Sequence, residues 1–153
     1  MSIDKRLNEL QITLPDVEAL GNYVPAVKGG RLVFVSGQLP KAEGRISYVG
    51  RIGRELTLDD GRRAARLCII NCLAALKSAL GSLDKVSQVL KITGYITSGV
   101  GFRDQHKIMD AASELLVDVF GPNGKHARAA VGVVELPLGA AVEIDMVCAV
   151  KSP

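Results

Sequence analysis

The chain has 153 residues, a mass of 16.2 kDa, 48% hydrophobic and 23% charged residues, and a net charge of +3. These values exclude a disordered or fibrous protein and suit one globular domain over residues 1–153. No apolar run reaches the roughly 18 residues of a membrane span, and the basic residues are interspersed with acidic ones, so nucleic acid is not an expected partner.

The first elements are a short helix and a pair of strands. Residues 2–11 have apolar positions at spacings of three and four, which is typical of an amphipathic helix. Two β-branched segments follow, at residues 23–27 and 31–38. Gly29 and Gly30 lie between them, and both tolerate positive φ, so the pattern predicts a hairpin with these glycines as its turn.

A loop and a long helix come next. Residues 40–55 contain a proline and several glycines, which predicts a loop with a small extra strand at 46–49. Residues 58–80 have one continuous apolar helical face. Thr57 is suited to cap the start of this helix, and Gly81 its end.

The second half of the sequence predicts a strand at 86–97, a helix at 104–120, and two strands at 129–136 and 141–150. The segment Pro137-Leu138-Gly139 resembles a hairpin turn, so we expect the last two strands to pair with each other. The whole order indicates an α+β sheet with helices on one face. Because strand 129–136 is apolar almost throughout, we expect another subunit to bury the open face.

Three cysteines argue for a structural role and a reducing compartment. Cys68 and Cys72 share a helix face but have no second pair of metal ligands nearby, so core packing is the better interpretation, as it is for Cys148. The first residues lack the pattern of a secretory signal. An odd number of cysteines without such a signal predicts a cytoplasmic protein.

Arg128 is the most informative polar residue. It precedes an apolar strand and needs an anionic partner, which is either a bound carboxylate or an ordinary salt bridge to Glu135 or Glu143. The residues alone favour neither the bound carboxylate nor the salt bridge. His126 points to the same side as Arg128 on an extended strand, although an exposed loop histidine is the more frequent case.

Glu143 lies in the strand expected to pair with that of Arg128, which places it toward Gly132. A carboxylate within Val142-Glu143-Ile144 is either on a solvated face or near the site with a raised pKa. The residues alone slightly favour the solvated face.

Several segments together resemble the YjgF/YER057c/UK114 family, whose best-known members are the RidA enamine/imine deaminases, once called endoribonucleases or translation inhibitors. The resemblance covers residues 20–150 and rests on GNYVP at 21–25, FVSGQLP at 34–40, HARAAV at 126–131, Leu136-Pro137 and VEID at 142–145.

This resemblance implies a chorismate-mutase-like mixed sheet, a homotrimer with sites in the clefts between subunits, and no metal or organic cofactor. It implies that Arg128 binds a substrate carboxylate and that Glu143 positions water. Tyr23 would lie in the cleft, the backbone carbonyl of Gly37 would face the substrate nitrogen, and Ala130 would contribute its backbone. The implied ligand is a small carboxylate metabolite.

Three positions depart from the family pattern. Ala129-Ala130 replaces a small polar pair, and Asp110 replaces an asparagine, which would oppose a carboxylate ligand if it points inward. The leading hypothesis is hydrolysis of 2-imino acids of the 2-aminoacrylate type. A non-catalytic binder of 2-oxo acids is the second, and an endoribonuclease is a distant third.

Overall fold

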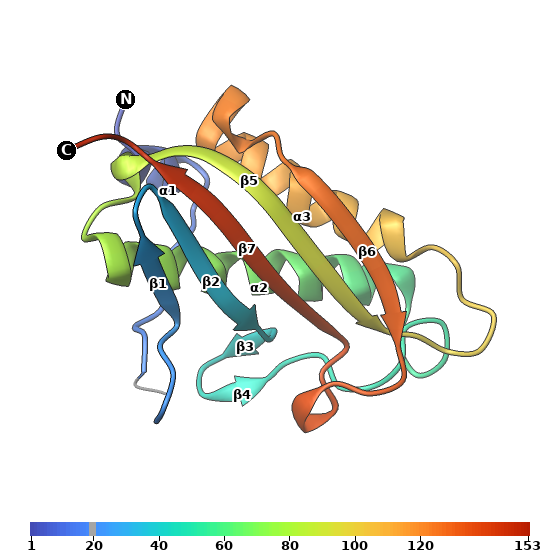
Figure 1. Cartoon of the computed structure of the whole chain (residues 1–153). Coiled ribbons are helices and arrows are strands. Elements are labelled where there is room, and N and C mark those ends of the chain that lie inside the picture. Colours follow the sequence, from blue (N-terminus) through green and yellow to red (C-terminus); the bar gives the residue numbers. More distant parts are fainter. Residues whose placement is uncertain (19–20) are drawn as a thin grey trace.

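A five-stranded sheet with helices on one face dominates the computed structural model, which describes residues 1–18 and 21–153 (Figure 1). The strands have the order β1-β2-β7-β5-β6, and only β5 and β6 are parallel neighbours. The expected α+β class, with two main helices and a short N-terminal one, is confirmed. The elements are α1 (Ile3–Glu9), β1 (Ala26–Gly29), β2 (Leu32–Gln38), β3 (Lys41–Ala42), β4 (Arg45–Ile46), α2 (Leu58–Leu80), η1 (Leu83–Lys85), β5 (Val86–Thr97), α3 (Gln105–Phe120), η2 (Gly121–Gly124), β6 (Ala127–Val133), η3 (Pro137–Gly139) and β7 (Val142–Val150).

Side-chain and glycine caps set the limits of α2. The Thr57 hydroxyl accepts a hydrogen bond from the backbone N–H of Asp60, whose carboxylate accepts one from the N–H of Thr57. Gly81 ends the helix with a φ of +81°, which a residue with a Cβ adopts only at a cost. These local signals explain why the expected helix at 58–80 is confirmed at both ends.

The first hairpin differs from the expectation in its turn and in its start. Gly29 pairs with Leu32, so the two-residue turn is Gly30–Arg31 and not Gly29–Gly30. Only one glycine is needed at positive φ, and Gly30 has a φ of +61°. The strand itself begins at Ala26, three residues after the predicted position 23.

The segment between β2 and α2 forms a two-stranded β3–β4 hairpin, earlier than the predicted strand at 46–49. Val49 lies outside it and makes an isolated bridge to Ala140. The hairpin is tied to α2 by Asn71, whose side-chain amide donates to the carbonyls of Leu39 and Lys41 at 2.9 and 3.0 Å. Because both of these hydrogen bonds satisfy its side-chain amide, Asn71 can be buried in an apolar helix face.

The predicted hairpin between the last two strands is wrong. Strand β5 lies between β6 and β7, parallel to β6 and antiparallel to β7 (Figure 1). The chain leaves β6 at Val133, crosses the end of β5 through η3, and enters β7 on its other side. Helix α3 is the crossover that parallel pairing of β5 and β6 requires.

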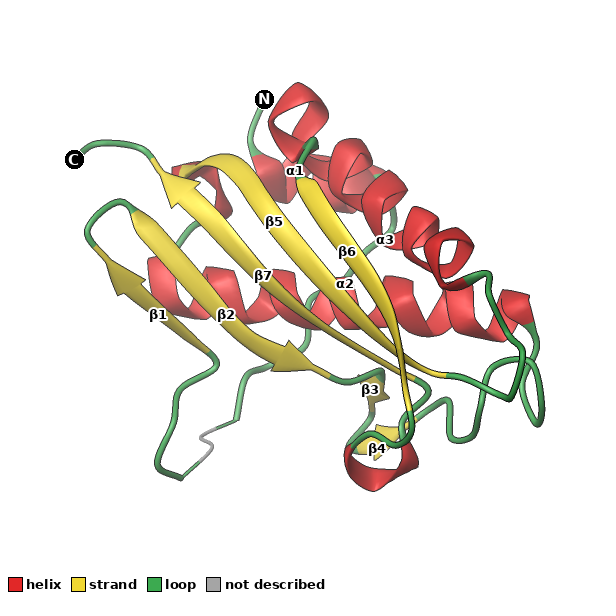
Figure 2. Cartoon of the chain, turned by 45° about the vertical axis from the view of Figure 1, so that its right-hand side comes forward, coloured by secondary structure: helices red, strands yellow, loops and turns green. Residues whose placement is uncertain are grey.

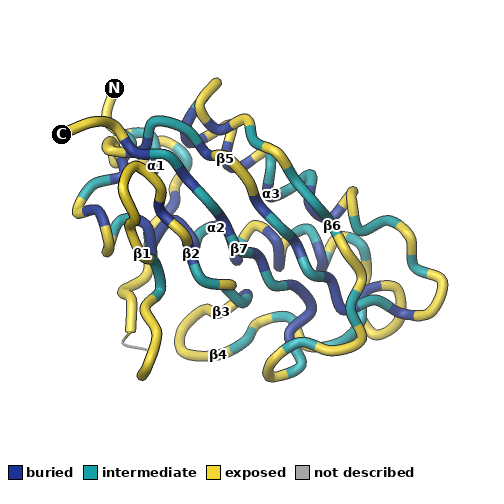
Figure 3. Tube along the Cα trace, in the orientation of Figure 1, coloured by how far each residue is buried: buried dark blue, intermediate teal, exposed yellow. Residues whose placement is uncertain are grey.

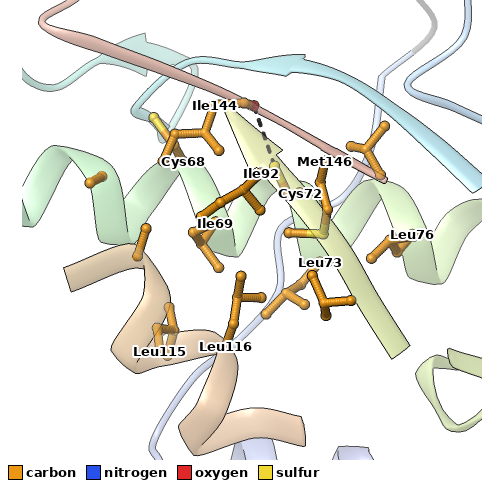
Figure 4. Close-up of a cluster of buried hydrophobic side chains, with 14 of the residues drawn as sticks. Cys68, Ile69, Cys72, Leu73, Leu76, Ile92, Leu115, Leu116, Ile144 and Met146 are labelled. Atoms are coloured by element: carbon orange, nitrogen blue, oxygen red, sulfur yellow. Dashed lines mark hydrogen bonds between the residues drawn. The ribbon is translucent and has the colours of Figure 1, made fainter. Parts of the chain in front are cut away.

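The core lies between the sheet and the two long helices (Figure 4). Cys68 and Cys72 are fully buried there, and their thiols donate to the carbonyls of Val142 and Ile144, each at 3.5 Å. Burial raises the pKa of both thiols well above the usual range and that of Cys148 to about 12. The predicted packing role of the cysteines is therefore confirmed.

None of the helices formed by the described residues covers the opposite face of the sheet (Figure 2). Along β7 the residues alternate between fully buried ones toward the helices and partly exposed ones on this open face. The strand register aligns Val27, Phe34 and Val147 in one apolar row across it, and Phe34 is 48% exposed. Exposure rises toward the two edge strands, β1 and β6 (Figure 3). No helix in the described ranges has the length and apolar character to cross a membrane.

Candidate functional site

The candidate residues fall into two groups on opposite faces of the sheet. Arg128 is aligned with Ile92, a core residue, so its side chain lies on the helix face at the edge of the sheet. Glu143 is aligned with Tyr95 and alternates with the buried Val142 and Ile144, so it lies on the open face. One chain therefore does not bring Arg128 and Glu143 together.

Helix α3 holds the Arg128 guanidinium against the edge of the sheet. Its Nη1 donates to the Asp110 carboxylate at 3.0 Å and to the Ser113 hydroxyl at 3.1 Å. Its Nη2 donates to the backbone carbonyl of His106 at 3.3 Å. The salt bridge is therefore made to Asp110, and neither Glu135 nor Glu143 is the partner; Glu135 pairs with Arg51 at 2.6 Å.

These contacts use only part of the guanidinium. It has five N–H donors, and the three contacts occupy both hydrogens of Nη1 and one of Nη2. The Nε–H and the other Nη2 hydrogen have no acceptor among the residues that the structure describes. Nε and Nη2 lie along the same edge of the planar guanidinium, and such an Nε–Nη2 fork matches the two oxygens of a carboxylate. The Arg128 side chain is 25% exposed, so it is not completely enclosed by the protein.

Ala130 lies next to Arg128 on the same face. It is aligned with Gly94 and packs against the core, and its methyl group offers no polar contact. Polar contacts at this position can therefore come only from its backbone.

On the open face, Glu143 lies near Tyr95 and Asp145. The hydroxyl of Tyr95 donates to the Asp145 carboxylate at 3.0 Å. Partial burial, together with the negative charge of Asp145, raises the pKa of Glu143. The hydrogen bond to Asp145 and burial raise the pKa of Tyr95. A carboxyl group with a raised pKa is better suited to accept and return a proton near neutral pH.

Gly37 lies beside Glu143 at an irregularity of β2. Val35 pairs with Met146 and Gln38 with Ile144, so Ser36 and Gly37 together face the single residue Asp145. Such a bulge redirects the backbone and is common near binding sites. A Cβ at position 37 would come within 2.8 Å of Glu143 Oε2, so a side chain here would force the carboxylate to move.

Tyr23 precedes β1, at the sheet edge opposite β6, and is 60% exposed. The candidate residues thus divide between the β1–β2–β7 side and the β6 edge. Arg128 and Glu143 are two strand spacings apart, about 10 Å, and three residues apart along β5, roughly another 10 Å. The sheet itself lies between their side chains.

Two surface hollows, of about 330 and 520 Å³, lie elsewhere. The first is lined by the 49–55 segment with Thr97, Glu135 and Gly139, and the second by residues around η1 and the C-terminus. Neither includes Arg128 or Glu143. In the described ranges, no group of three or more histidine, cysteine or acidic side chains could hold a metal ion.

The sequence interpretation missed Ser113 and understated His126. Nε2 of His126 lies 2.9 Å from the Ser113 hydroxyl, and Nδ1 lies 2.5 Å from the carbonyl of Gly124. His126 is half-buried, so the expectation of an exposed loop histidine is wrong. The available signal was the spacing of positions 106, 110 and 113, which places them on one face of α3.

Comparisons with known proteins agree with this fold. "Protein TCP17" from Trypanosoma cruzi is 43% identical over 91% of this chain and 88% of its own length. The crystal structure of Atu1372 from Agrobacterium tumefaciens, of unknown function, is 44% identical, covers 97% of this chain and 92% of that one, and has a TM-score of 0.92. Escherichia coli TdcF with bound serine is 28% identical over 91% and 94% of the two chains, with a TM-score of 0.63.

Residues 4–149 match the family described as "YjgF/chorismate mutase-like, putative endoribonuclease". The match includes all strands of the main sheet up to Ala149, both long helices, and both groups of candidate residues. The chain belongs to the YjgF/chorismate mutase-like family.

Proposed function

We propose that this protein is an enamine/imine deaminase that hydrolyses 2-imino acids to 2-oxo acids and ammonia, in clefts between the subunits of a homotrimer. The observation that carries the proposal is the Nε–Nη2 edge of Arg128, where Nε–H and one Nη2 hydrogen have no acceptor among the described residues. TdcF, a relative with serine bound in its crystal structure, supports a small carboxylate as the ligand class.

The division of the candidate residues supports sites between subunits. Arg128 is at the β6 edge, whereas Glu143, Gly37 and Tyr23 lie toward the other side of the sheet. If the β6 edge of one copy meets the β1–β2 side of the next, Arg128 and Glu143 can face the same ligand. The apolar row on the open face is suited to burial in that assembly. We expect a species of three times 16.2 kDa in sedimentation.

The reaction requires only water. Arg128 holds the carboxylate of the imino acid, and Glu143 accepts a proton from a water molecule as its oxygen bonds to the C=N carbon. Glu143 returns this proton to the imine nitrogen, which gives a carbinolamine. The C–N bond then breaks as the hydroxyl proton moves through Glu143 to the nitrogen, which releases ammonia and leaves the 2-oxo acid. A backbone carbonyl near Gly37 would stabilise the protonated nitrogen, as expected from the resemblance.

Asp110 supports a second candidate, a binding protein for 2-oxo acids without catalysis. Its carboxylate already pairs with Arg128, so the attraction of the arginine for an anionic ligand is reduced. Weak binding without turnover is the expected behaviour if this neutralisation dominates.

The test is ammonia release from freshly generated 2-aminoacrylate, compared between the wild type and Arg128→Ala. Arg63→Ala, which removes an exposed arginine on α2, is the matched control. The proposal predicts a rate above background in the wild type and the control, and loss of that rate in Arg128→Ala. Background rates in all three proteins, together with pyruvate binding that requires Arg128, would favour the binding protein instead.

A further inference from the structure

Beyond the residues of the family pattern, Arg128 has a second layer of support. Ser113 of α3 contacts the guanidinium, and His126, the residue directly before β6, contacts Ser113. His126 in turn contacts the carbonyl of Gly124 in η2. Three successive elements of the chain thus meet behind one side chain.

The chemistry of the groups fixes the direction of the two outer hydrogen bonds, and a neutral His126 sets the direction of the one between Ser113 and His126. A guanidinium only donates, so the Ser113 oxygen accepts from Arg128 Nη1. The Ser113 hydroxyl hydrogen is then available for Nε2 of a neutral His126. The carbonyl of Gly124 only accepts, so Nδ1 carries the imidazole hydrogen. A neutral His126 fits this chain in one tautomer, and every donor has an acceptor.

The far end of the chain is fixed to the fold. Gly124 is buried, and a Cβ there would collide with the backbone carbonyl of Leu116 in α3. The carbonyl that anchors His126 is therefore on a segment pressed against the helix that carries Ser113. A rigid anchor of this kind restricts the imidazole, the hydroxyl and finally the guanidinium.

We propose that Ser113 and His126 are positioning residues that hold the Arg128 guanidinium with its Nε–Nη2 fork toward the ligand. This inference rests on the proposed role of Arg128 in carboxylate binding. Asp110 neutralises the guanidinium but contacts only one of its nitrogens. Together with the His106 carbonyl on Nη2, the second contact on Nη1, from Ser113, restricts the rotation that the Asp110 contact alone leaves free.

The same pair is not arranged as a nucleophile and its base. A serine nucleophile needs an oxygen with free electron density, and here the Ser113 oxygen accepts from a positively charged donor. The hydrogen bond from Arg128 lowers the nucleophilicity of the Ser113 oxygen. The same hydrogen bond is the contact by which Ser113 would hold Arg128 in place.

The positioning role is tested first without ligand. The ¹H–¹⁵N heteronuclear NOE of Arg128 Nε reports the rigidity of the side chain in the full-length protein. We expect a value close to that of the backbone in the wild type, a clear fall in Ser113→Ala and His126→Leu, and recovery in His126→Gln, whose amide oxygen can accept from Ser113. Ser78→Ala, an exposed serine on α2, is the matched control and should leave the value unchanged. Equal rigidity of Arg128 in all five proteins would overturn the inference.

The second measurement is the dissociation constant of pyruvate for the same proteins. Ser113→Ala and His126→Leu should each weaken binding about three- to tenfold, and the double variant should be no weaker than the worse single one, because the two residues act in series. His126→Gln should stay within about twofold of the wild type. Additive losses in the double variant would contradict the serial chain. If the wild type binds no pyruvate or 2-oxobutyrate, the proposed function fails, and the NOE measurement still decides whether Ser113 and His126 position Arg128.

Discussion

The carboxylate of Glu143 lies directly over the backbone of Gly37, so closely that a methyl group at position 37 would come within 2.8 Å of Oε2. The two residues are on neighbouring strands, β2 and β7, and the bulge at Ser36–Gly37 creates the space. The close approach of Gly37 restricts the position of the Glu143 carboxylate, the proposed acid/base group. A substitution at position 37 can therefore displace this carboxylate without removing it.

Gly37→Ala should displace the Glu143 carboxylate and leave the fold intact, because position 37 does not have a positive φ. We expect kcat/KM for imine hydrolysis to fall on the order of 10- to 100-fold, the usual effect of a misplaced catalytic group. Gly29→Ala is the matched control, since a Cβ there meets nothing within 4 Å. Equal activity of the two variants would show that the position of Glu143 is unimportant.

Glu143→Gln should separate activity from stability. Loss of the proton acceptor should lower kcat by about 10²- to 10⁴-fold. Because the pKa of Glu143 is raised in the folded protein, its stability contribution is fully present below the ordinary glutamate pKa and is lost as the pH rises through the folded value. As the pH rises across this window, the free energy of unfolding of Glu143→Gln should therefore increase relative to that of the wild type. Urea unfolding at several pH values measures it, and a constant difference would contradict the raised pKa.

Asp110→Asn should tighten the binding of a 2-oxo acid. The amide oxygen can still accept from Arg128 Nη1, but the negative charge beside the ligand carboxylate is gone. Asp110 is 48% exposed, so solvent screens the effect to about 0.2–1 kcal/mol, or at most roughly fivefold in the dissociation constant. Titration calorimetry with pyruvate provides the measurement. Weaker binding in Asp110→Asn would mean that the ligand does not use Arg128.

Sequence patterns predicted the helices better than the strand pairing. Thr57 and Gly81 fix the ends of α2 by local hydrogen bonds and backbone conformation, which the sequence displays directly. The partners of β6 and β7 depend on the crossover by α3, which brings β5 between them. The predicted strand–helix–strand order at 86–136 indicates such a parallel unit, but the turn-like Pro137-Leu138-Gly139 suggested the simpler hairpin.

The candidate site was predictable only in part, for a related reason. Arg128 and Glu143 carry signals in the sequence because an arginine and a glutamate beside apolar strand residues need partners. The face on which each lies follows from the register of β5 with both neighbours, which the sequence does not specify. Ser113 and His126 belong to different elements, and their contact arises from packing alone.

Gly94 should prove essential to the packing that places Arg128. It is aligned with Ala130 on β5, and a Cβ there would collide with the side chain of Met109 on α3. Gly94→Ala should cost about 1–3 kcal/mol by overpacking and lower the melting temperature by several degrees. Gly94→Ala combined with Met109→Ala should lose less stability than the sum of the two single changes. Additive losses in thermal unfolding would rule out the close approach.

The central claim is that Arg128 of one subunit and Glu143 of another serve the same ligand, because one chain places them on opposite faces of its sheet. Mixing Arg128→Ala chains with Glu143→Gln chains tests this most directly, after unfolding and joint refolding. Each variant alone should be inactive, whereas random mixed trimers should contain intact sites at about a quarter of their interfaces, as expected for independent pairing of two equally abundant chains. The account predicts recovery of roughly that share of the wild-type rate of imine hydrolysis. No recovery from mixed trimers, shown to form by mass spectrometry, would place both residues in one subunit's site and contradict it.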